Sequence, residues 1–116
     1  GGGANALSEP ESSSLANYLL AVSPRLVLTF HATAGAVISN GAGDASAAAK
    51  VYGQESGFTK YEQHDEDGIF SYTTTGEMED WLRDKHSIPT LLVELRTQYS
   101  NEITRQKSAL WAMLSL

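Results

Sequence analysis

The stretch Pro89-Thr90-Leu91-Leu92-Val93-Glu94-Leu95-Arg96 predicts a buried β-strand and decides the fold. Its β-branched and apolar residues follow a proline, which can open a strand but does not fit in the middle of one. A nearly continuous apolar run of this kind is typical of a strand covered on both faces, as in a parallel sheet between helices. The stretch therefore favours an α/β fold.

Glu94 interrupts this apolar run. An isolated buried carboxylate is costly, so Glu94 should be paired with a cation, hydrogen-bonded, close to a metal or protonated. Open α/β sheets bind their ligands beyond the carboxyl ends of the strands, and Glu94 falls at such an end. Two interpretations are therefore open. Glu94 is either a structural or solvent-facing glutamate, or a group that takes part in chemistry.

The composition limits the classes of partner. The chain has 116 residues, enough for one hydrophobic core and too few for two ordinary domains. Its net charge is -6 and it has no cluster of Lys or Arg, so nucleic acid is not an expected partner. No run has transmembrane length or the pattern of a signal peptide, so a membrane is not expected either. Without cysteine, any metal site must use histidine and carboxylate ligands.

Helical and strand patterns alternate along the chain. Helices are expected after Ser8-Glu9-Pro10-Glu11, over residues 45–52, over residues 77–85 and after Asn101. Strands are expected at residues 25–31, 34–38, 58–62 and 89–96. This alternation predicts an α/β domain with a mostly parallel mixed sheet and helices on both faces. Whether Gly1-Gly2-Gly3 is native or a cloning remnant is left open.

Local signals give these helices caps and apolar faces. Ser8, Asp44 and Asn101 are candidate N-caps. In the first helix, the residues expected on the apolar face are Leu15, Tyr18, Leu19 and Val22. In the last helix, the expected apolar contacts come from Ile103, Leu110, Trp111 and Leu114, although their spacing is irregular.

Two predicted strands end on groups that can bind a metal or move a proton, His31 and Glu94. Tyr72 lies between them in the sequence, in a segment rich in hydroxyl groups. A histidine, a carboxylate and a phenol at one edge of a sheet would suit metal-assisted hydrolysis. In that chemistry the metal polarises a carbonyl, the carboxylate takes a proton from water and the phenol holds the substrate. A lone histidine at a strand end is more often only hydrogen-bonded, so that alternative stays open.

Four segments in order resemble the C-terminal half of zinc metallocarboxypeptidases, and within that family the bacterial murein peptide amidase branch. They are Ser8-Glu9-Pro10-Glu11, the strand ending in Phe30-His31, the stretch from Tyr72-Thr73-Thr74-Thr75-Gly76 to Trp81, and Leu92-Val93-Glu94-Leu95-Arg96. The resemblance implies that residues 1–116 form a single partial domain, the C-terminal segment of a carboxypeptidase-like catalytic domain. An intact enzyme of this kind hydrolyses a C-terminal peptide bond or a murein-peptide amide bond, in the bacterial cytoplasm or the cell envelope.

The resemblance implies a role for four residues. His31 matches the family's third zinc ligand, and Glu94 matches the base that activates the zinc-bound water and later protonates the leaving amine. Tyr72 matches the mobile tyrosine that closes over the terminal carboxylate of the peptide substrate. Glu79 falls at the base of the specificity pocket, where an acid would favour a basic terminal group. For Glu79, and more so for Glu77, an acid that stabilises a helix N-terminus is the alternative.

The metal ligands depart from the family pattern. The family's first two zinc ligands, in a His-x-x-Glu motif, and its carboxylate-binding asparagine and arginine precede the matched region and are not in this chain. The other histidines are His64, in a solvated acidic turn with Asp65, Glu66 and Asp67, and His86, near a helix C-terminus. One protein ligand does not hold zinc. We therefore expect the upstream half of the same enzyme, or a second chain, to supply the rest.

Two further interpretations stay open. The chain could be a non-catalytic α/β module that binds a peptide or a partner and has lost the zinc site. It could also assemble with a copy of itself, because half of a domain exposes sheet edges and apolar faces. The enzyme interpretation requires that His31 and Glu94 end neighbouring strands and face one shared cavity.

Overall fold

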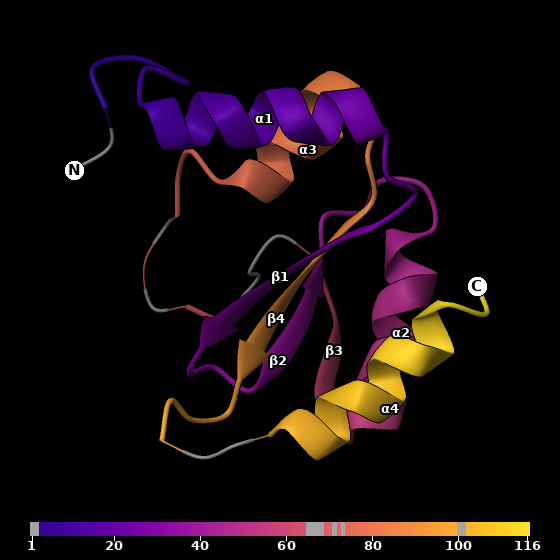
Figure 1. Cartoon of the computed structure of the whole chain (residues 1–116). Coiled ribbons are helices and arrows are strands. Elements are labelled where there is room, and N and C mark those ends of the chain that lie inside the picture. The colour runs from indigo at the N-terminus through magenta and orange to yellow at the C-terminus, as the bar shows by residue number, and fades with distance from the viewer. Residues whose placement is uncertain (1–2, 65–68, 71, 73, 100–101) are drawn as a thin grey trace.

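A computed structural model describes residues 3–64, 69–70, 72, 74–99 and 102–116 of the chain. The elements in order are α1 (Pro10–Val22), β1 (Val27–Ala32), β2 (Ala36–Ser39), α2 (Ala45–Ser56), β3 (Lys60–His64), α3 (Met78–His86), β4 (Thr90–Leu95) and α4 (Ile103–Met113) (Figure 1). The fold is α/β, as predicted. Among the described helices, none combines the length and the apolar character needed to cross a membrane.

The four strands form one mixed sheet in the order β1-β4-β2-β3. β1 runs parallel to β4 and β2 runs parallel to β3, whereas β2 and β4 are antiparallel. Two of the three pairings are therefore parallel, which confirms the prediction of a mostly parallel mixed sheet. β4 lies inside the sheet, and its residues from Thr90 to Glu94 are buried, as the apolar run predicts.

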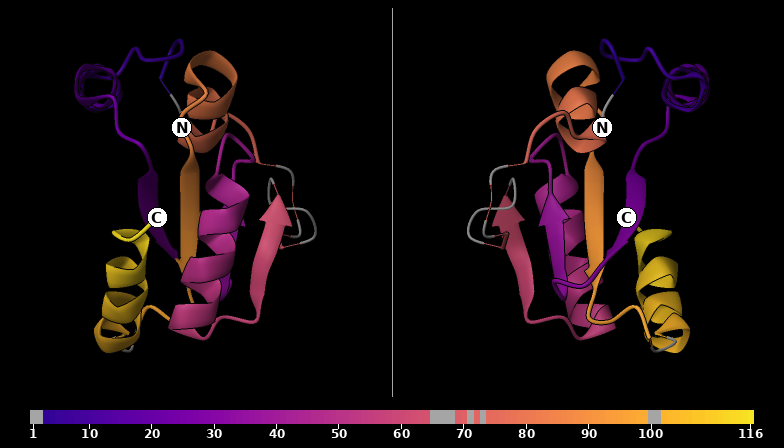
Figure 2. Two further views of the ribbon diagram at one scale, coloured as in Figure 1. Left: turned by 90° about the vertical axis from the view of Figure 1, so that its right-hand side faces the viewer. Right: turned by 90° about the vertical axis from the view of Figure 1, so that its left-hand side faces the viewer.

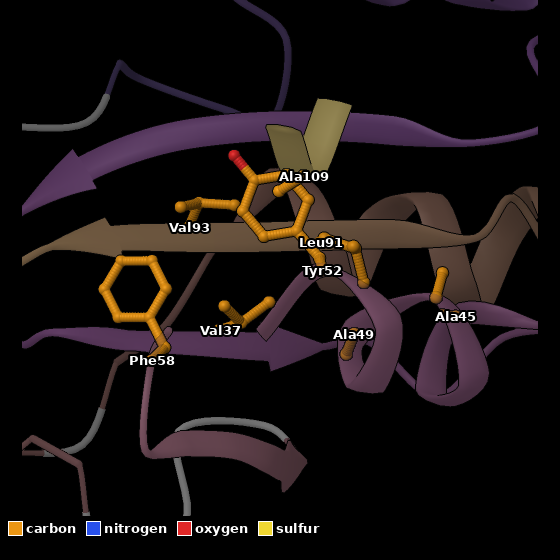
Figure 3. Close-up of a cluster of buried hydrophobic side chains, with 9 residues drawn as sticks. Val37, Ala45, Ala49, Tyr52, Phe58, Leu91, Val93 and Ala109 are labelled. Carbon is orange, nitrogen blue, oxygen red and sulfur yellow. The ribbon is translucent and has the colours of Figure 1, made fainter. Parts of the chain in front are cut away.

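One face of the sheet, which we call the core face, is covered by α2 and α4 (Figure 2). Small alanine side chains let these helices approach the strands and each other. The buried cluster consists of Val37, Ala45, Ala48, Ala49, Tyr52, Phe58, Leu91, Val93 and Ala109 (Figure 3). Because side chains alternate along a strand, Leu91 and Val93 point to the core face, whereas Leu92 and Glu94 point to the opposite face.

We call that opposite face the site face, and two smaller clusters cover parts of it. Near the start of β1, α1 and α3 contribute to a cluster of Leu19, Leu82 and Ile88 packed with Val27, Met78 and Trp81. Further along the strands, a second cluster consists of Ala36, Ile38 and Leu92 packed with Ile69 and Phe70. Helices therefore pack on both faces, as predicted.

α2 is longer than predicted. It continues to Ser56 and ends at Gly57, which adopts a left-handed conformation with φ of 68°. The predicted helix over residues 45–52 ended just before Gly53, but Gly53 has a different role. A Cβ atom on Gly53 would lie 2.1 Å from the Cβ of Tyr61. Gly53 therefore lets α2 and β3 approach closely.

The side-chain caps predicted for α1 and α2 do not form. Glu9, not Ser8, is the N-cap of α1, and the Ser8 hydroxyl instead donates a hydrogen bond of 2.9 Å to the Glu9 carboxylate. Asp44 precedes α2 but makes no capping hydrogen bond through its side chain. Pro10 occupies the start of α1, where its missing N–H is not needed. Asn101 lies outside the described residues.

The predicted apolar faces of α1 and α4 are largely uncovered. On α1, Leu19 is buried, but Leu15, Tyr18 and Val22 are exposed. On α4, the four residues expected to make apolar contacts are 40 to 76% exposed: Ile103, Leu110, Trp111 and Leu114. α4 is held instead by the buried residues Gln106 and Ala109. Within the described chain, burial is therefore confirmed for Leu19, whereas the burial expected of the other residues on these two faces is wrong.

Candidate active site

β1 and β4 place His31 beside Glu94. The two strands are parallel neighbours, and His31 is the register partner of Glu94. Side chains at partner positions of a parallel pair point to the same face, so both belong to the site face. The predicted position of these two residues on neighbouring strands and one face is therefore confirmed, and the cavity that they were expected to share stays a prediction.

Glu94 is buried, with 4% of its surface exposed. Its Oε2 accepts a hydrogen bond of 3.3 Å from the backbone N–H of Ala34. Among the described residues, no cation pairs with Glu94 and no donor reaches its Oε1. Within this part of the chain, Glu94 is therefore not a structural ion pair. Its Oε1 is left to accept a hydrogen bond from a water or a ligand.

His31 is exposed, near the end of β1 at the edge of the sheet. The described part of the chain gives its imidazole no hydrogen-bond partner. The interpretation of His31 as a histidine held by a structural hydrogen bond is therefore not supported there. A neutral imidazole in this position is able to bind a metal ion.

Glu79 extends the site face towards the start of β1. The hydroxyl of Thr29 donates a hydrogen bond of 2.6 Å to Oε1 of Glu79. Thr29 precedes His31 by two residues and so shares its face of the strand. Glu79 also lies in the first turn of α3, where its negative charge stabilises the positive end of the helix dipole. Both interpretations of Glu79, as an acid that stabilises the helix N-terminus and as an acid that binds a basic group of the substrate, therefore stay open.

Tyr72 is attached to the site face through a neighbouring ring. It is 67% exposed, and its ring stacks on Phe70 with centroids 5.6 Å apart and planes at 29°. Phe70 packs against the site-face cluster that includes Leu92. The exposed phenol of Tyr72 is therefore held on the same side of the sheet as Glu94 and is available to a ligand.

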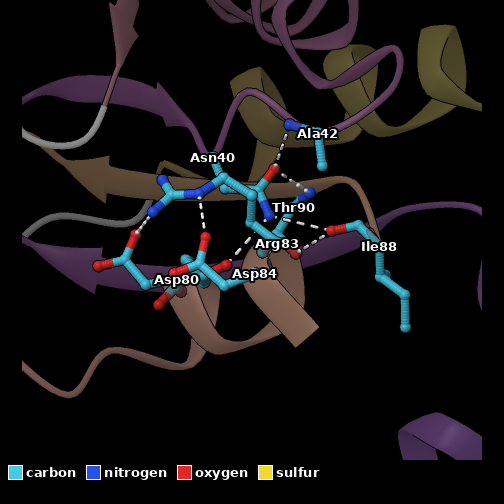
Figure 4. A network of polar contacts seen from close by, with 8 residues as sticks. Asn40, Ala42, Asp80, Arg83, Asp84, Ile88 and Thr90 are labelled. Carbon is cyan, nitrogen blue, oxygen red and sulfur yellow. Dashed lines mark hydrogen bonds and ion pairs between the residues drawn. The ribbon is translucent and has the colours of Figure 1, made fainter. Parts of the chain in front are cut away.

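Asn40 organises this region, although no sequence pattern singled it out. Its Nδ2 donates hydrogen bonds of 2.9 Å to the carbonyl of Ile88 and 3.1 Å to the carbonyl of Glu79 (Figure 4). Its Oδ1 accepts hydrogen bonds of 3.0 Å from the N–H of Thr90 and 3.2 Å from the N–H of Ala42. The buried amide therefore fixes the first turn of α3 against the start of β4.

A small cleft lies where α3 meets the sheet. Its lining residues are Ile38, Ser39, Asn40, Glu77, Glu79, Asp80 and Leu92. Three of these are acids, and Glu79 among them accepts the hydrogen bond from Thr29. Asp80 forms an ion pair of 3.0 Å with Arg83. Arg83 also donates a hydrogen bond of 2.8 Å to Asp84, which lowers the pKa of Asp84.

The other histidines do not complete a metal site in the described chain. His86 lies in the last turn of α3, as predicted, and its ring packs edge-on against Trp81 at a centroid distance of 4.5 Å. His64 ends β3 rather than lying in a turn, and Asp65, Glu66 and Asp67 lie outside the described residues. No group of three His, Asp or Glu side chains able to hold a metal occurs in the described ranges. These residues therefore do not fit a whole zinc site, and no step through zinc follows from them.

No protein-family model and no curated protein sequence matches the chain. Among solved structures, the crystal structure of murein-tripeptide amidase MpaA from Escherichia coli O157 matches with a TM-score of 0.69 and 18% sequence identity. The match covers 97% of this chain and 43% of the amidase chain. The chain therefore has the fold of part of a murein-tripeptide amidase, which confirms the carboxypeptidase-like fold that the resemblance implied.

Proposed function

We propose that this chain forms one part of a zinc-dependent metallocarboxypeptidase site, which hydrolyses a C-terminal peptide bond or a murein-peptide amide bond. Polypeptide outside this sequence would supply the remaining zinc ligands. The observation that carries the proposal is the register pairing of His31 with Glu94 on the site face. The likeness in fold to an amidase supports the class of bond.

In this proposal Glu94 is the general base. A carboxylate that accepts a single hydrogen bond, as Oε2 does from Ala34, keeps acceptor capacity for a water molecule. Glu94 takes one proton from the attacking water as the new bond from its oxygen to the carbonyl carbon forms. It then gives that proton to the amine nitrogen as the carbon–nitrogen bond breaks, so the carboxylate is regenerated.

His31 contributes one metal ligand. A catalytic zinc site uses about three protein ligands, so at least two more must reach the neighbourhood of His31. His31 lies on β1, which is an edge strand of the sheet formed by the described residues. This position is consistent with a site that is shared between two segments.

Glu79 and Tyr72 are proposed to bind the two charged groups of the substrate's terminal residue. The Glu79 carboxylate would pair with an amino group, such as the side-chain amine of a diamino acid. The exposed phenol of Tyr72 would donate a hydrogen bond to the terminal carboxylate. The proposed substrate is therefore a peptide that ends in a basic residue.

The test uses the complete protein in which this sequence occurs, purified with zinc and assayed for release of a terminal amino acid. His31→Ala should lower the bound zinc and the hydrolysis rate together. His86→Ala, which removes an exposed imidazole from α3, is the matched control and should change neither. Unchanged zinc content in His31→Ala would remove His31 from the site. A wild-type protein with neither zinc nor hydrolysis would favour the alternative of a non-catalytic peptide- or partner-binding module.

A further inference from the structure

Asn40 is followed in the chain by Gly41. In such a pair the next backbone nitrogen can attack the side-chain amide, because glycine has no Cβ atom to hinder the approach. The asparagine then loses ammonia and becomes aspartate or isoaspartate. The other three asparagines precede alanine, tyrosine and glutamate, so Asn40 has the amide that is intrinsically most prone to this reaction.

The fold holds this amide away from the reaction. Nδ2 of Asn40 donates two hydrogen bonds and Oδ1 accepts two, which is the full capacity of a primary amide. Turning the amide towards the nitrogen of Gly41 would break these hydrogen bonds. Only 3% of Asn40 is exposed, so water has little access to it. The folded chain therefore protects a reactive group.

α3 provides this protection from both of its ends. The carbonyls that hold Nδ2 of Asn40 belong to Glu79, in the first turn of α3, and to Ile88, just after the last turn (Figure 4). The apolar cluster that holds α3 on the sheet has three buried residues, Leu19, Leu82 and Ile88. Segments with few buried apolar contacts open more readily than the main core. Opening of α3 would free Nδ2 from both carbonyls.

We propose that Asn40-Gly41 is a deamidation site that α3 keeps closed. When α3 lifts from the sheet, the Gly41 nitrogen loses its proton to a base in solution and forms a bond to Cγ of Asn40. The bond from Cγ to Nδ2 breaks, and Nδ2 leaves as ammonia after it takes a proton from water. One water molecule then opens the resulting cyclic imide, at one carbonyl to give aspartate and at the other to give isoaspartate.

Either product prevents α3 from returning. An aspartate at position 40 is an acceptor without a donor, and it would face the carbonyl oxygens of Glu79 and Ile88. An isoaspartate would lengthen the main chain before Gly41 by one carbon atom. With α3 released, Glu79 would also lose the hydrogen bond from Thr29. Deamidation therefore converts a reversible opening into a permanent one.

The first test compares deamidation in the folded and the unfolded state. The complete protein in which this sequence occurs is incubated in neutral buffer with and without urea, and each asparagine is followed by peptide mapping and mass spectrometry. In urea, Asn40 should react faster than Asn5 and Asn17. In buffer, Asn40 should react at least about tenfold more slowly than in urea, because only open molecules react. Equal rates of Asn40 deamidation in the two states would overturn the proposal.

The second test asks whether α3 controls the rate. Leu82→Ala leaves a cavity beneath α3 and should speed deamidation of Asn40 in buffer at least about tenfold. Leu95→Ala, which loosens packing against the core-face cluster, should change this rate by less than about twofold. If circular dichroism shows that Leu82→Ala does not fold, Thr29→Val removes the hydrogen bond to Glu79 and should give a smaller acceleration. No acceleration, or equal acceleration by Leu95→Ala, would contradict control by α3.

The third test examines the product through Asn40→Asp. Hydrogen exchange of the backbone amides in α3 should be at least about tenfold faster than in the wild type, while exchange in α2 stays slow. Asn5→Asp makes the same change of charge at an exposed position and should leave α3 unchanged. Wild-type exchange in α3, or fast exchange in both helices, would contradict a switch that releases α3 alone. None of these readouts depends on hydrolysis at the candidate active site.

Discussion

Glu94 on β4 lies between His31 on β1 and Ala36 on β2, as the register partner of both. β4 is inserted between the other two strands, so the carboxylate has an exposed imidazole on one side and a small buried methyl group on the other. Along the same face, Thr29 connects β1 to Glu79 through a hydrogen bond of 2.6 Å. The sheet order thus brings residues that are far apart in the sequence onto one surface.

A disulfide tests this register directly, because the chain has no native cysteine. Neighbouring strands lie about 4.8 Å apart, and disulfides need a Cα separation of roughly 4.4 to 6.8 Å. The double variant His31→Cys/Glu94→Cys should therefore cross-link on mild oxidation, measured by loss of free thiols. In the control pair Phe30→Cys/Glu94→Cys the side chains point to opposite faces, so it should remain reduced. Equally fast cross-linking of both pairs would contradict the register.

Asn40→Ala should strongly destabilise the chain. The substitution removes all four hydrogen bonds of the buried amide and leaves two carbonyls and two N–H groups without their partner. We expect a loss of about 2 to 4 kcal/mol in the free energy of unfolding, measured in urea. Asn5→Ala, at an exposed position, should cost less than about 0.5 kcal/mol. A similar cost for the two variants would show that the Asn40 network does not hold α3 to the sheet.

Tyr52 should make stability fall at high pH. Burial raises the pKa of Tyr52 to about 12, against about 10 in an unfolded chain. The folded state therefore holds this proton more tightly than the unfolded chain does. This difference in proton affinity adds about 2 kcal/mol to the free energy of unfolding below a pH of about 10, and the added stability is lost as the pH rises to about 12. The free energy of unfolding should fall less over this range in Tyr52→Phe than in the wild type. Tyr99→Phe, at an exposed phenol, should behave as the wild type. If the free energy of unfolding falls as much in Tyr52→Phe as in the wild type, the prediction is contradicted.

Glu79→Gln should change substrate preference more than turnover. Glutamine can still accept the hydrogen bond from Thr29 but has no charge to pair with an amine. In the complete protein, the ratio of kcat/KM for a peptide with a basic end to that for a neutral end should fall about tenfold or more. Glu11→Gln, an exposed acid in the first turn of α1, is the control and should leave the ratio unchanged. An unchanged ratio in Glu79→Gln would limit Glu79 to its role at the helix N-terminus.

The buried strand could be predicted from local pattern, and the proximity of His31 and Glu94 followed from the expected parallel sheet and the resemblance to carboxypeptidases. A continuous apolar run places Leu91 and Val93 in a covered strand, and parallel strands bring their carboxyl ends to one edge. β3 begins at Lys60, later than its pattern suggested, because Phe58 packs into the core before the strand starts. Short strands of this kind have weak sequence signals, so their limits depend on packing.

Contacts between distant segments could not be predicted in this way. Asn40 precedes a glycine, which is typical of a turn, and nothing nearby indicates that α3 and β4 converge on its side chain. Gly53 resembled a helix end because glycine is common at that position. Its close approach to Tyr61 is not visible in the sequence. Helical spacing defined an apolar face on α4 but not what covers it, so the exposure of Leu110 and its neighbours was missed.

The hydrolysis rate of Glu94→Gln in the complete protein, with zinc content measured on the same sample, tests whether Glu94 is the general base. The rate of amide hydrolysis should fall about a thousandfold, because glutamine cannot take a proton from water, while the bound zinc stays at the wild-type level. A rate within tenfold of wild type would contradict the assignment of Glu94 as the general base beside His31.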